Sequence, residues 1–128
     1  MDKNSNTLNW FEISVTDIVR AKKFYEFVFS VQLTDMEEMM GKKIAAFPAE
    51  NGNGKASGGL VQGQMHKPSI DGTIVYLNAN PDIQLIIDRI EAAGGKLLMP
   101  KTLVKPEIGY LADFIDSEGN KVGLHAQN

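Results

Sequence analysis

Few side chains in this sequence could carry out chemistry. The 128 residues include no cysteine, which excludes disulfides, thiol nucleophiles, iron–sulfur clusters and cysteine-bound zinc. The two histidines, His66 and His125, lie 59 positions apart, and His66 falls in a linker rich in glycine. Among the acids Glu12 is the most informative, because it lies in a short alternating segment between Trp10 and Ser14. A carboxylate placed this way can act as a general acid or base if its surroundings are partly apolar.

Glu12 belongs to the first of two strand-then-helix segments. Apolar and polar residues alternate over residues 9–15, which predicts a strand with Glu12 on its more polar face. Residues 16–17 are Thr and Asp, whose short oxygen-bearing side chains predict a helix cap. Apolar residues at three- and four-residue spacing then predict a helix over residues 18–29.

The second segment repeats the first after 64 residues, which is half the length of the chain. Residues 73–79 alternate like the first strand. Asn80 is expected to cap the following helix, with Pro81 in its first turn. An apolar stripe covers residues 83–93, and the glycines at 94–95 are expected to end the helix. The sequence therefore predicts two copies of one module.

Strand-like sequence and turn residues follow each helix, so each copy is predicted to be a β-α-β-β-β module. Module one spans about residues 8–63 and module two about residues 72–126, within one domain of residues 1–128. The last strand of module one is predicted at residues 59–62, in a stretch rich in Gly and Asn. The alternative is a mobile loop over residues 51–63, which would then be the lid of any pocket.

Composition narrows the classes of function. Hydrophobic residues make up 43% and charged residues 23% of the chain, and the net charge is −3. The 13 Lys and Arg residues are scattered, so no basic stripe predicts binding to nucleic acid or to an anionic membrane. No apolar run is longer than four residues, which is far too short for a membrane-spanning helix. The polar start shows no secretory signal, so we expect a cytoplasmic protein.

Three segments, at residues 11–29, 90–102 and 109–125, resemble the vicinal oxygen chelate superfamily of glyoxalases, extradiol dioxygenases and bleomycin- or fosfomycin-resistance proteins. One small departure is Ser117, which stands where the family's turn usually has proline. The resemblance implies an α+β, glyoxalase-like fold: two βαβββ modules form a curled mixed-sheet cup around one cavity, with the helices outside.

The resemblance also implies which side chains line the cup. We expect Glu12 as acid or base, with a pKa raised by burial, and His125 on the closing strand sharing its proton. Alternatively, Glu12 pairs with a Lys or Arg or marks a wet pocket, and His125 is a surface residue near the end of the chain. The expected ligand-binding residues are Trp10, Ser14, Ile74, Tyr76 and Asn78. Trp10 is either a flat wall for a ligand or a filler of space.

Metal-dependent members of this family hold one divalent ion with four side chains, mostly His and Glu, one from each of four cup strands. The resemblance places Trp10, Ile74 and Gly123 at three of these positions, and Gly59 or Leu60 near the other. None of these side chains offers an oxygen or imidazole donor. We therefore expect no metal and no other cofactor.

Two classes of function stay open. One is a glyoxalase-like lyase or isomerase that works without metal, with Glu12 as acid or base. The other is a binding protein that sequesters a small, partly aromatic molecule, as resistance proteins of the family do. A third possibility is a dimer whose cavity has lost its function. The expected partners are a small-molecule ligand and a second copy of the chain in a homodimer. Three clustered methionines, Met36, Met39 and Met40, are expected to serve packing or dimer contact.

Overall fold

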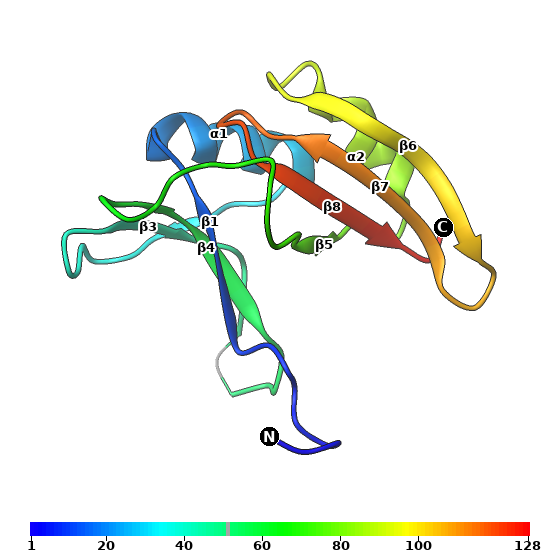
Figure 1. Ribbon diagram of the computed structural model, residues 1–128, viewed down its shortest axis with the longest axis horizontal. Coiled ribbons are helices and arrows are strands. Elements are labelled where there is room, and N and C mark those ends of the chain that lie inside the picture. The colour runs from blue at the N-terminus through cyan, green and yellow to red at the C-terminus, as the bar shows by residue number, and fades with distance from the viewer. Residues whose placement is uncertain (51) are drawn as a thin grey trace.

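The computed structural model describes residues 1–50 and 52–128 (Figure 1). Its helices are α1 (Ile18–Phe29) and α2 (Ile83–Ile90). Its strands are β1 (Trp10–Ser14), β2 (Thr34–Asp35), β3 (Lys43–Ala46), β4 (Ser57–Gln62), β5 (Tyr76–Asn78), β6 (Lys96–Lys105), β7 (Gly109–Ile115) and β8 (Lys121–Ala126). Residue 51, at the start of the predicted lid, lies outside the described residues.

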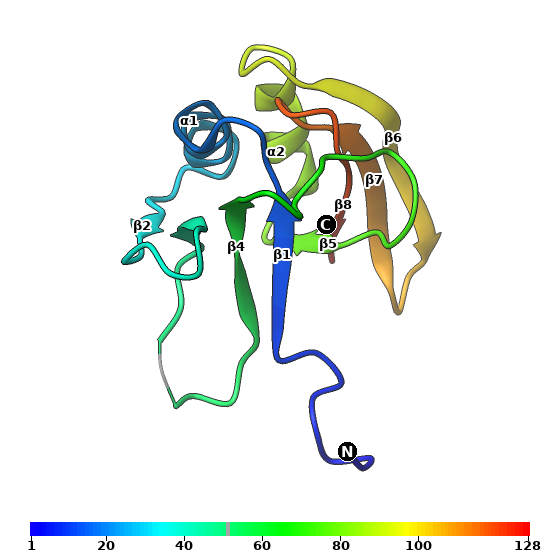
Figure 2. The same cartoon turned by 60° about the vertical axis from the view of Figure 1, so that its left-hand side comes forward.

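The strands form two four-stranded sheets of identical topology. The first has the order β1-β4-β3-β2 and the second the order β5-β8-β7-β6. In each sheet the module's first strand runs parallel to its last one, β1 beside β4 and β5 beside β8, and the other pairs are antiparallel. This repetition confirms the predicted α+β fold of two βαβββ modules. Figure 2 shows α1 and α2 next to each other, with α1 above the first sheet and α2 beside the second.

The predicted core face is confirmed. The inward residues of β1 and its extension, Ile13 and Val15, are buried, and so are Leu77 and Ala79 in the equivalent part of module two. Val122 and Leu124 of β8 are also buried, as expected. Phe11 and Val75 are partly buried and pack against the same core. A single apolar core therefore continues from one sheet to the other beneath the helices.

The predicted capping residue is confirmed for α1 but not for α2. Asp17 caps α1 as predicted, because its carboxylate accepts hydrogen bonds from the backbone N–H groups of Val19 and Arg20. The prediction of Asn80 and Pro81 at the start of α2 was wrong, since Asp82 is the cap and accepts from the N–H of Gln84. Gly94 adopts a left-handed conformation (φ 101°) after the last turn, as the sequence predicted.

The equivalent strands of the two modules differ in length. Residues 59–62 do form a strand, because β4 lies in the middle of the first sheet between β1 and β3. The strand expected after α1 is reduced to the two residues of β2. In module two, β6 continues through Pro100 to Lys105, with irregularities in its pairing with β7. An edge strand tolerates a proline because no neighbour needs its N–H.

No helix in the described part of the chain is both long and apolar enough to span a membrane. The cytoplasmic location stays a prediction of the sequence.

Candidate functional site

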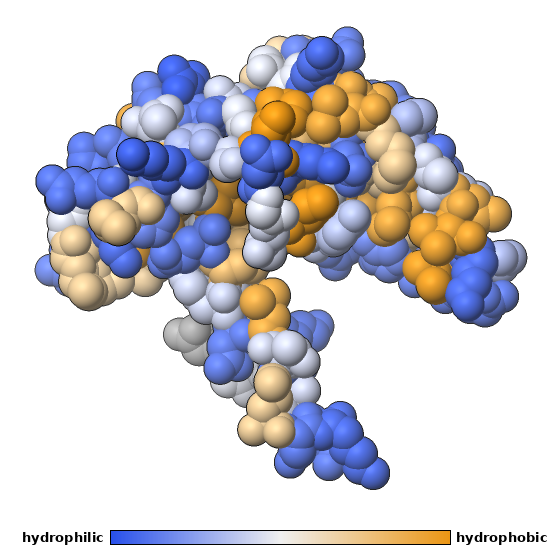
Figure 3. All heavy atoms as spheres, viewed as in Figure 1, coloured by the Kyte–Doolittle hydropathy of each residue, from blue (hydrophilic) through white to orange (hydrophobic). Residues whose placement is uncertain are grey.

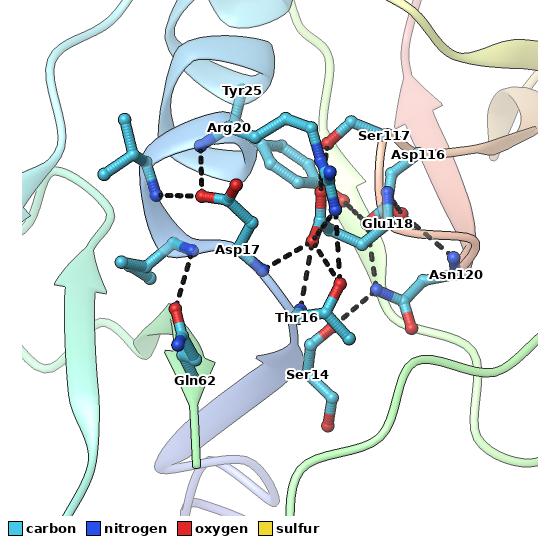
Figure 4. A network of polar contacts seen from close by, with 12 residues as sticks. Ser14, Thr16, Asp17, Arg20, Tyr25, Gln62, Asp116, Ser117, Glu118 and Asn120 are labelled. Atoms are coloured by element: carbon cyan, nitrogen blue, oxygen red, sulfur yellow. Dashed lines mark hydrogen bonds and ion pairs between the residues drawn. The ribbon is translucent and has the colours of Figure 1, made fainter.

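The end of β1 is fixed by the turn between β7 and β8. The carboxylate of Glu118, in this turn, accepts hydrogen bonds from Nε of Arg20 (2.7 Å), from the backbone N–H of Asp17 (2.9 Å) and from both N–H and Oγ1 of Thr16 (3.0 Å each; Figure 4). Burial would raise the pKa of Glu118, but these hydrogen bonds outweigh it and hold the pKa at about 2. Glu118 therefore joins module two to the start of α1 as an ionised group.

A second part of this network is buried beneath the first. Asp116 accepts hydrogen bonds from the hydroxyl of Tyr25 (2.6 Å) and from the side chain of Asn120 (3.0 Å). Asn120 also donates to the backbone carbonyl of Ser14, at the end of β1 (2.7 Å; Figure 4). Burial, together with the neighbouring Asp116, raises the pKa of Tyr25 well above its ordinary value. This network positions β1, and β1 carries the candidate site.

Glu12 of β1 has a histidine partner that the sequence did not predict. Its Oε1 lies 2.7 Å from Nε2 of His66, and its Oε2 accepts a hydrogen bond from Nε1 of Trp10 (3.3 Å). Because an ionised carboxylate only accepts, the hydrogen of this contact belongs to His66. The other ring nitrogen of His66, Nδ1, is buried and has no hydrogen-bond partner among the described residues.

These contacts lower the pKa of Glu12. The hydrogen bond from His66 has the largest effect, burial opposes it, and Trp10 and the positive charge of Lys42 lower the pKa further. The raised pKa expected from the sequence was therefore wrong. At neutral pH Glu12 is an ionised carboxylate held in one orientation.

Two hollows meet at Glu12. The first, of about 280 Å³, is mostly apolar, and its lining is Trp10, Glu12, Met36, Met39, Met40, Lys42 and Ile44. The second, of about 160 Å³, is polar and lies between the modules; Ser14, Lys67, Asp71 and Lys121 are among its lining residues. Two of the predicted site residues, Trp10 and Glu12, thus share the apolar hollow, and Ser14 lines the polar one.

The site residues predicted in module two lie elsewhere. Nε2 of His125 is 2.7 Å from the backbone carbonyl of Ile108, so the expected contact between His125 and Glu12 is not formed. Tyr76 is 46% exposed, and its ring covers Gly123. The side chain of Asn78 accepts hydrogen bonds from Asn80.

Neither of the two hollows at Glu12 includes His125, Tyr76 or Asn78, nor the half-buried Ile74. Figure 3 shows apolar side chains gathered over the second sheet on one face of the molecule. Leu98, Leu103, Val104 and Ile108 are exposed in this sheet and its β6–β7 turn. The two modules of one chain thus leave the cup open.

The positions at which relatives hold a divalent metal do not fit one here. Trp10 and Ile74 offer no donor, and the glycines have no room for one. A Cβ added to Gly123 would lie 2.3 Å from the ring of Tyr76, and one added to Gly59 would lie 2.8 Å from the carbonyl oxygen of Ala45. The described residues contain no group of three or more His, Asp or Glu side chains placed to hold a metal.

Comparison with known proteins agrees with this architecture. The model of the Glyoxalase/Bleomycin resistance protein/Dioxygenase superfamily matches residues 7–124. The chain belongs to this superfamily. A curated relative, "Putative glyoxylase CFP32" of Mycobacterium bovis, is 27% identical over an alignment 127 residues long, which covers 95% of this chain and 46% of the relative. A Mycobacterium tuberculosis protein of the same name matches equally well. The chain therefore spans about half the length of the curated relatives it matches.

Solved structures also share the fold. A glyoxalase/bleomycin resistance protein from Albidiferax ferrireducens superposes with a TM-score of 0.66 at 18% identity, covering 96% of this chain and all of the other. TnmS3, an antibiotic binding protein from Streptomyces, gives a TM-score of 0.64 at 20% identity, covering 99% of this chain and all of TnmS3. Maize glyoxalase I, as a V278E mutant, gives 0.66 at 18% identity, covering 93% of this chain and 45% of that chain.

Proposed function

We propose that this protein binds a small, partly apolar molecule in the hollow at Trp10 and Glu12, without a metal and without changing the molecule chemically. The observation that carries the proposal is the fixed, ionised state of Glu12, which His66 holds at 2.7 Å. A carboxylate with a lowered pKa is a poor proton donor at neutral pH, and it is also a weakened base. It remains a good acceptor for a polar group of a ligand.

The lining of the hollow suits a binding role. The hydrogen bond to Glu12 fixes the indole of Trp10, which then presents a flat wall at one side. Methionine side chains are flexible and polarisable, so they adapt to ligands of different shape. The antibiotic-binding role named for TnmS3 shows that a chain of this fold and length can have such a function, and we extend that role to this chain as part of the proposal.

A second candidate function rests on the contact between Glu12 and His66. A carboxylate that orients an imidazole is a common arrangement for general base catalysis, with the histidine as the base. The protein would then be a lyase or isomerase in which Glu12 positions His66. The buried state of Nδ1 argues against this role, because a substrate must reach the nitrogen that takes the proton.

We also propose that two copies of the chain form a C₂ homodimer that covers the open face of each cup. The open faces carry Trp10, which is 41% exposed, and Tyr76, which is 46% exposed. Large aromatic side chains exposed on a concave sheet face are typical of surfaces that meet a partner or a ligand.

The test of the binding proposal uses Trp10, which is the only tryptophan of the chain. Small aromatic compounds with polar substituents are screened for a saturable change in tryptophan emission, and hits are measured by calorimetry. Glu12→Gln is expected to weaken a hit by roughly tenfold, and Glu37→Gln, outside the hollow, is expected to have no effect. A time course of the bound compound by NMR must show no conversion. Conversion of a hit that depends on His66 would replace the binding proposal by the catalytic one.

A further inference from the structure

Three of the six methionines line one hollow together with the only tryptophan. Met36, Met39 and Met40 fall within five residues between β2 and β3, and all three contribute to the hollow at Trp10. The sequence favoured packing or dimer contact for them, and within the single chain they are 38%, 47% and 90% exposed. Thioethers left this accessible are free to meet something that enters the hollow.

Thioether sulfur is a soft, neutral donor. It binds soft monovalent ions such as Cu⁺ and Ag⁺ and has little affinity for Mg²⁺, Ca²⁺ or Mn²⁺, which prefer oxygen. Each methionine side chain has three rotatable bonds, so three of them on one short segment can turn toward a shared ion. The thioethers of this hollow therefore suit a soft monovalent ion, although they do not suit the divalent metals of the family.

Two other features of the hollow favour a cation. The face of an indole attracts positive charge, and Trp10 has its ring fixed by the hydrogen bond from its Nε1 to Glu12. Glu12 places a carboxylate on the same lining. The ammonium group of Lys42 opposes these effects, but it sits on a long flexible side chain that can swing into solvent.

We propose that the hollow formed by Met36, Met39, Met40 and Trp10 is a binding site for a soft monovalent metal ion, Cu⁺ or its stable analogue Ag⁺. The thioethers are the ligands, and the indole of Trp10 covers the bound ion. This goes beyond the binding of an organic molecule and does not depend on it. The two kinds of ligand would compete for the hollow, because both contact Trp10.

The experiment titrates the 128-residue chain with silver nitrate in a chloride-free buffer. Calorimetry is expected to show one Ag⁺ per chain, and the emission of Trp10 is expected to fall in step with binding. The triple variant Met36→Leu, Met39→Leu, Met40→Leu keeps the apolar volume and removes the sulfur atoms. It is expected to weaken binding by roughly tenfold or more.

Met65→Leu is the matched control, because Met65 is 91% exposed and lies outside the hollow. It is expected to bind Ag⁺ like the parent protein. Anaerobic competition with a Cu⁺ chelator should give the same ranking of variants, and Zn²⁺ should not bind. Equal Ag⁺ affinity of the parent and the triple variant, or no saturable binding at all, would overturn the proposal. Either result leaves the organic-ligand proposal standing, because the silver titration contains no organic ligand.

Discussion

At the scale of single residues, Glu12 shows what sequence reasoning could reach and what it could not. Alternation along β1 correctly placed Glu12 beside Trp10 on the face away from the core. The partner of Glu12 could not be predicted, because His66 lies in the linker between the modules. Tertiary contacts fix the course of that linker: the N–H of Ser69 donates to Asn120 (2.9 Å), and the carbonyl of Ser69 accepts from the N–H of Lys121 (3.2 Å). No local pattern in the linker encodes these contacts.

Glu118 gives a prediction for acid stability. Its folded-state pKa of about 2 lies below the ordinary value of 4.5. The ionised carboxylate of Glu118 therefore stabilises the fold fully above pH 4.5, and this stabilisation is lost as the pH falls toward 2. We expect Glu118→Gln to lower the free energy of unfolding by about 2 kcal/mol at pH 7. Urea melts at several pH values would show the difference between the parent and the variant shrinking as the pH falls from 4.5 to 2.

The control for this experiment is Glu107→Gln, because the side chain of Glu107 is 73% exposed and its contact with Lys105 is long, at 3.9 Å. This substitution should leave the melts unchanged at every pH. A constant difference between parent and Glu118→Gln from pH 7 to pH 2 would contradict the assignment of an ionised, hydrogen-bonded Glu118.

Another prediction from single residues is about the divalent metals that other members of the family bind. We expect purified protein to hold no stoichiometric zinc, nickel, iron or manganese, because the four cup positions lack donors. Elemental analysis by plasma mass spectrometry measures this directly. A stoichiometric divalent metal that survives dialysis would mean that the alignment of Trp10, Ile74 and Gly123 with the ligand positions is wrong.

At the scale of elements, the duplicated module was predictable because both helices carry clear apolar stripes. The end of each element was less predictable, as the start of α2 shows. Asn80 and Asp82 are both good capping residues, and the local sequence does not choose between them. The structure chooses Asp82, because the side-chain oxygen of Asn80 accepts instead from the backbone N–H of Gln127, after β8 (2.8 Å).

The packing of α2 on its sheet can be measured with two leucine-sized side chains of the same helix. Ile87 is 8% exposed and faces the core, and Leu85 is 50% exposed. We expect Ile87→Ala to cost about 2–5 kcal/mol in the free energy of unfolding, because it leaves a cavity between helix and sheet. Leu85→Ala should cost less than about 1 kcal/mol. Similar losses at both positions would contradict the assignment of the buried face.

At the scale of the whole molecule, the expected cup is only partly present. Family resemblance predicted that Trp10 and Glu12 would face Tyr76 and Asn78 across one cavity. In the structure α1 and α2 lie side by side, and the turn carrying Glu118 fixes the end of β1 against module two (Figure 2, Figure 4). The concave faces of the two sheets consequently stay open within one chain. The way in which the two modules pack against each other depends on tertiary contacts. The alternation of apolar residues in strands and the apolar stripes of helices do not encode these contacts.

An open cup leads to a prediction about assembly. We expect light scattering to give the mass of a dimer, about twice 14.1 kDa, at micromolar concentration. Iodide should quench the emission of Trp10 more strongly after dilution to the monomer, because the proposed dimer covers the cup. A stable monomer throughout the concentration range would refute the homodimer, and the binding hollow would then have to function in an open cup.

The central claim is that Glu12 is a fixed, ionised carboxylate that serves binding rather than proton transfer. Carbon-13 NMR titration of the glutamate side-chain carboxyls tests it most directly. We predict a midpoint for Glu12 below 4.5 in the parent protein, and a higher midpoint in His66→Ala, which removes the hydrogen bond that lowers the pKa most. A midpoint for Glu12 above 4.5 in the parent, or one unchanged in His66→Ala, would contradict the account.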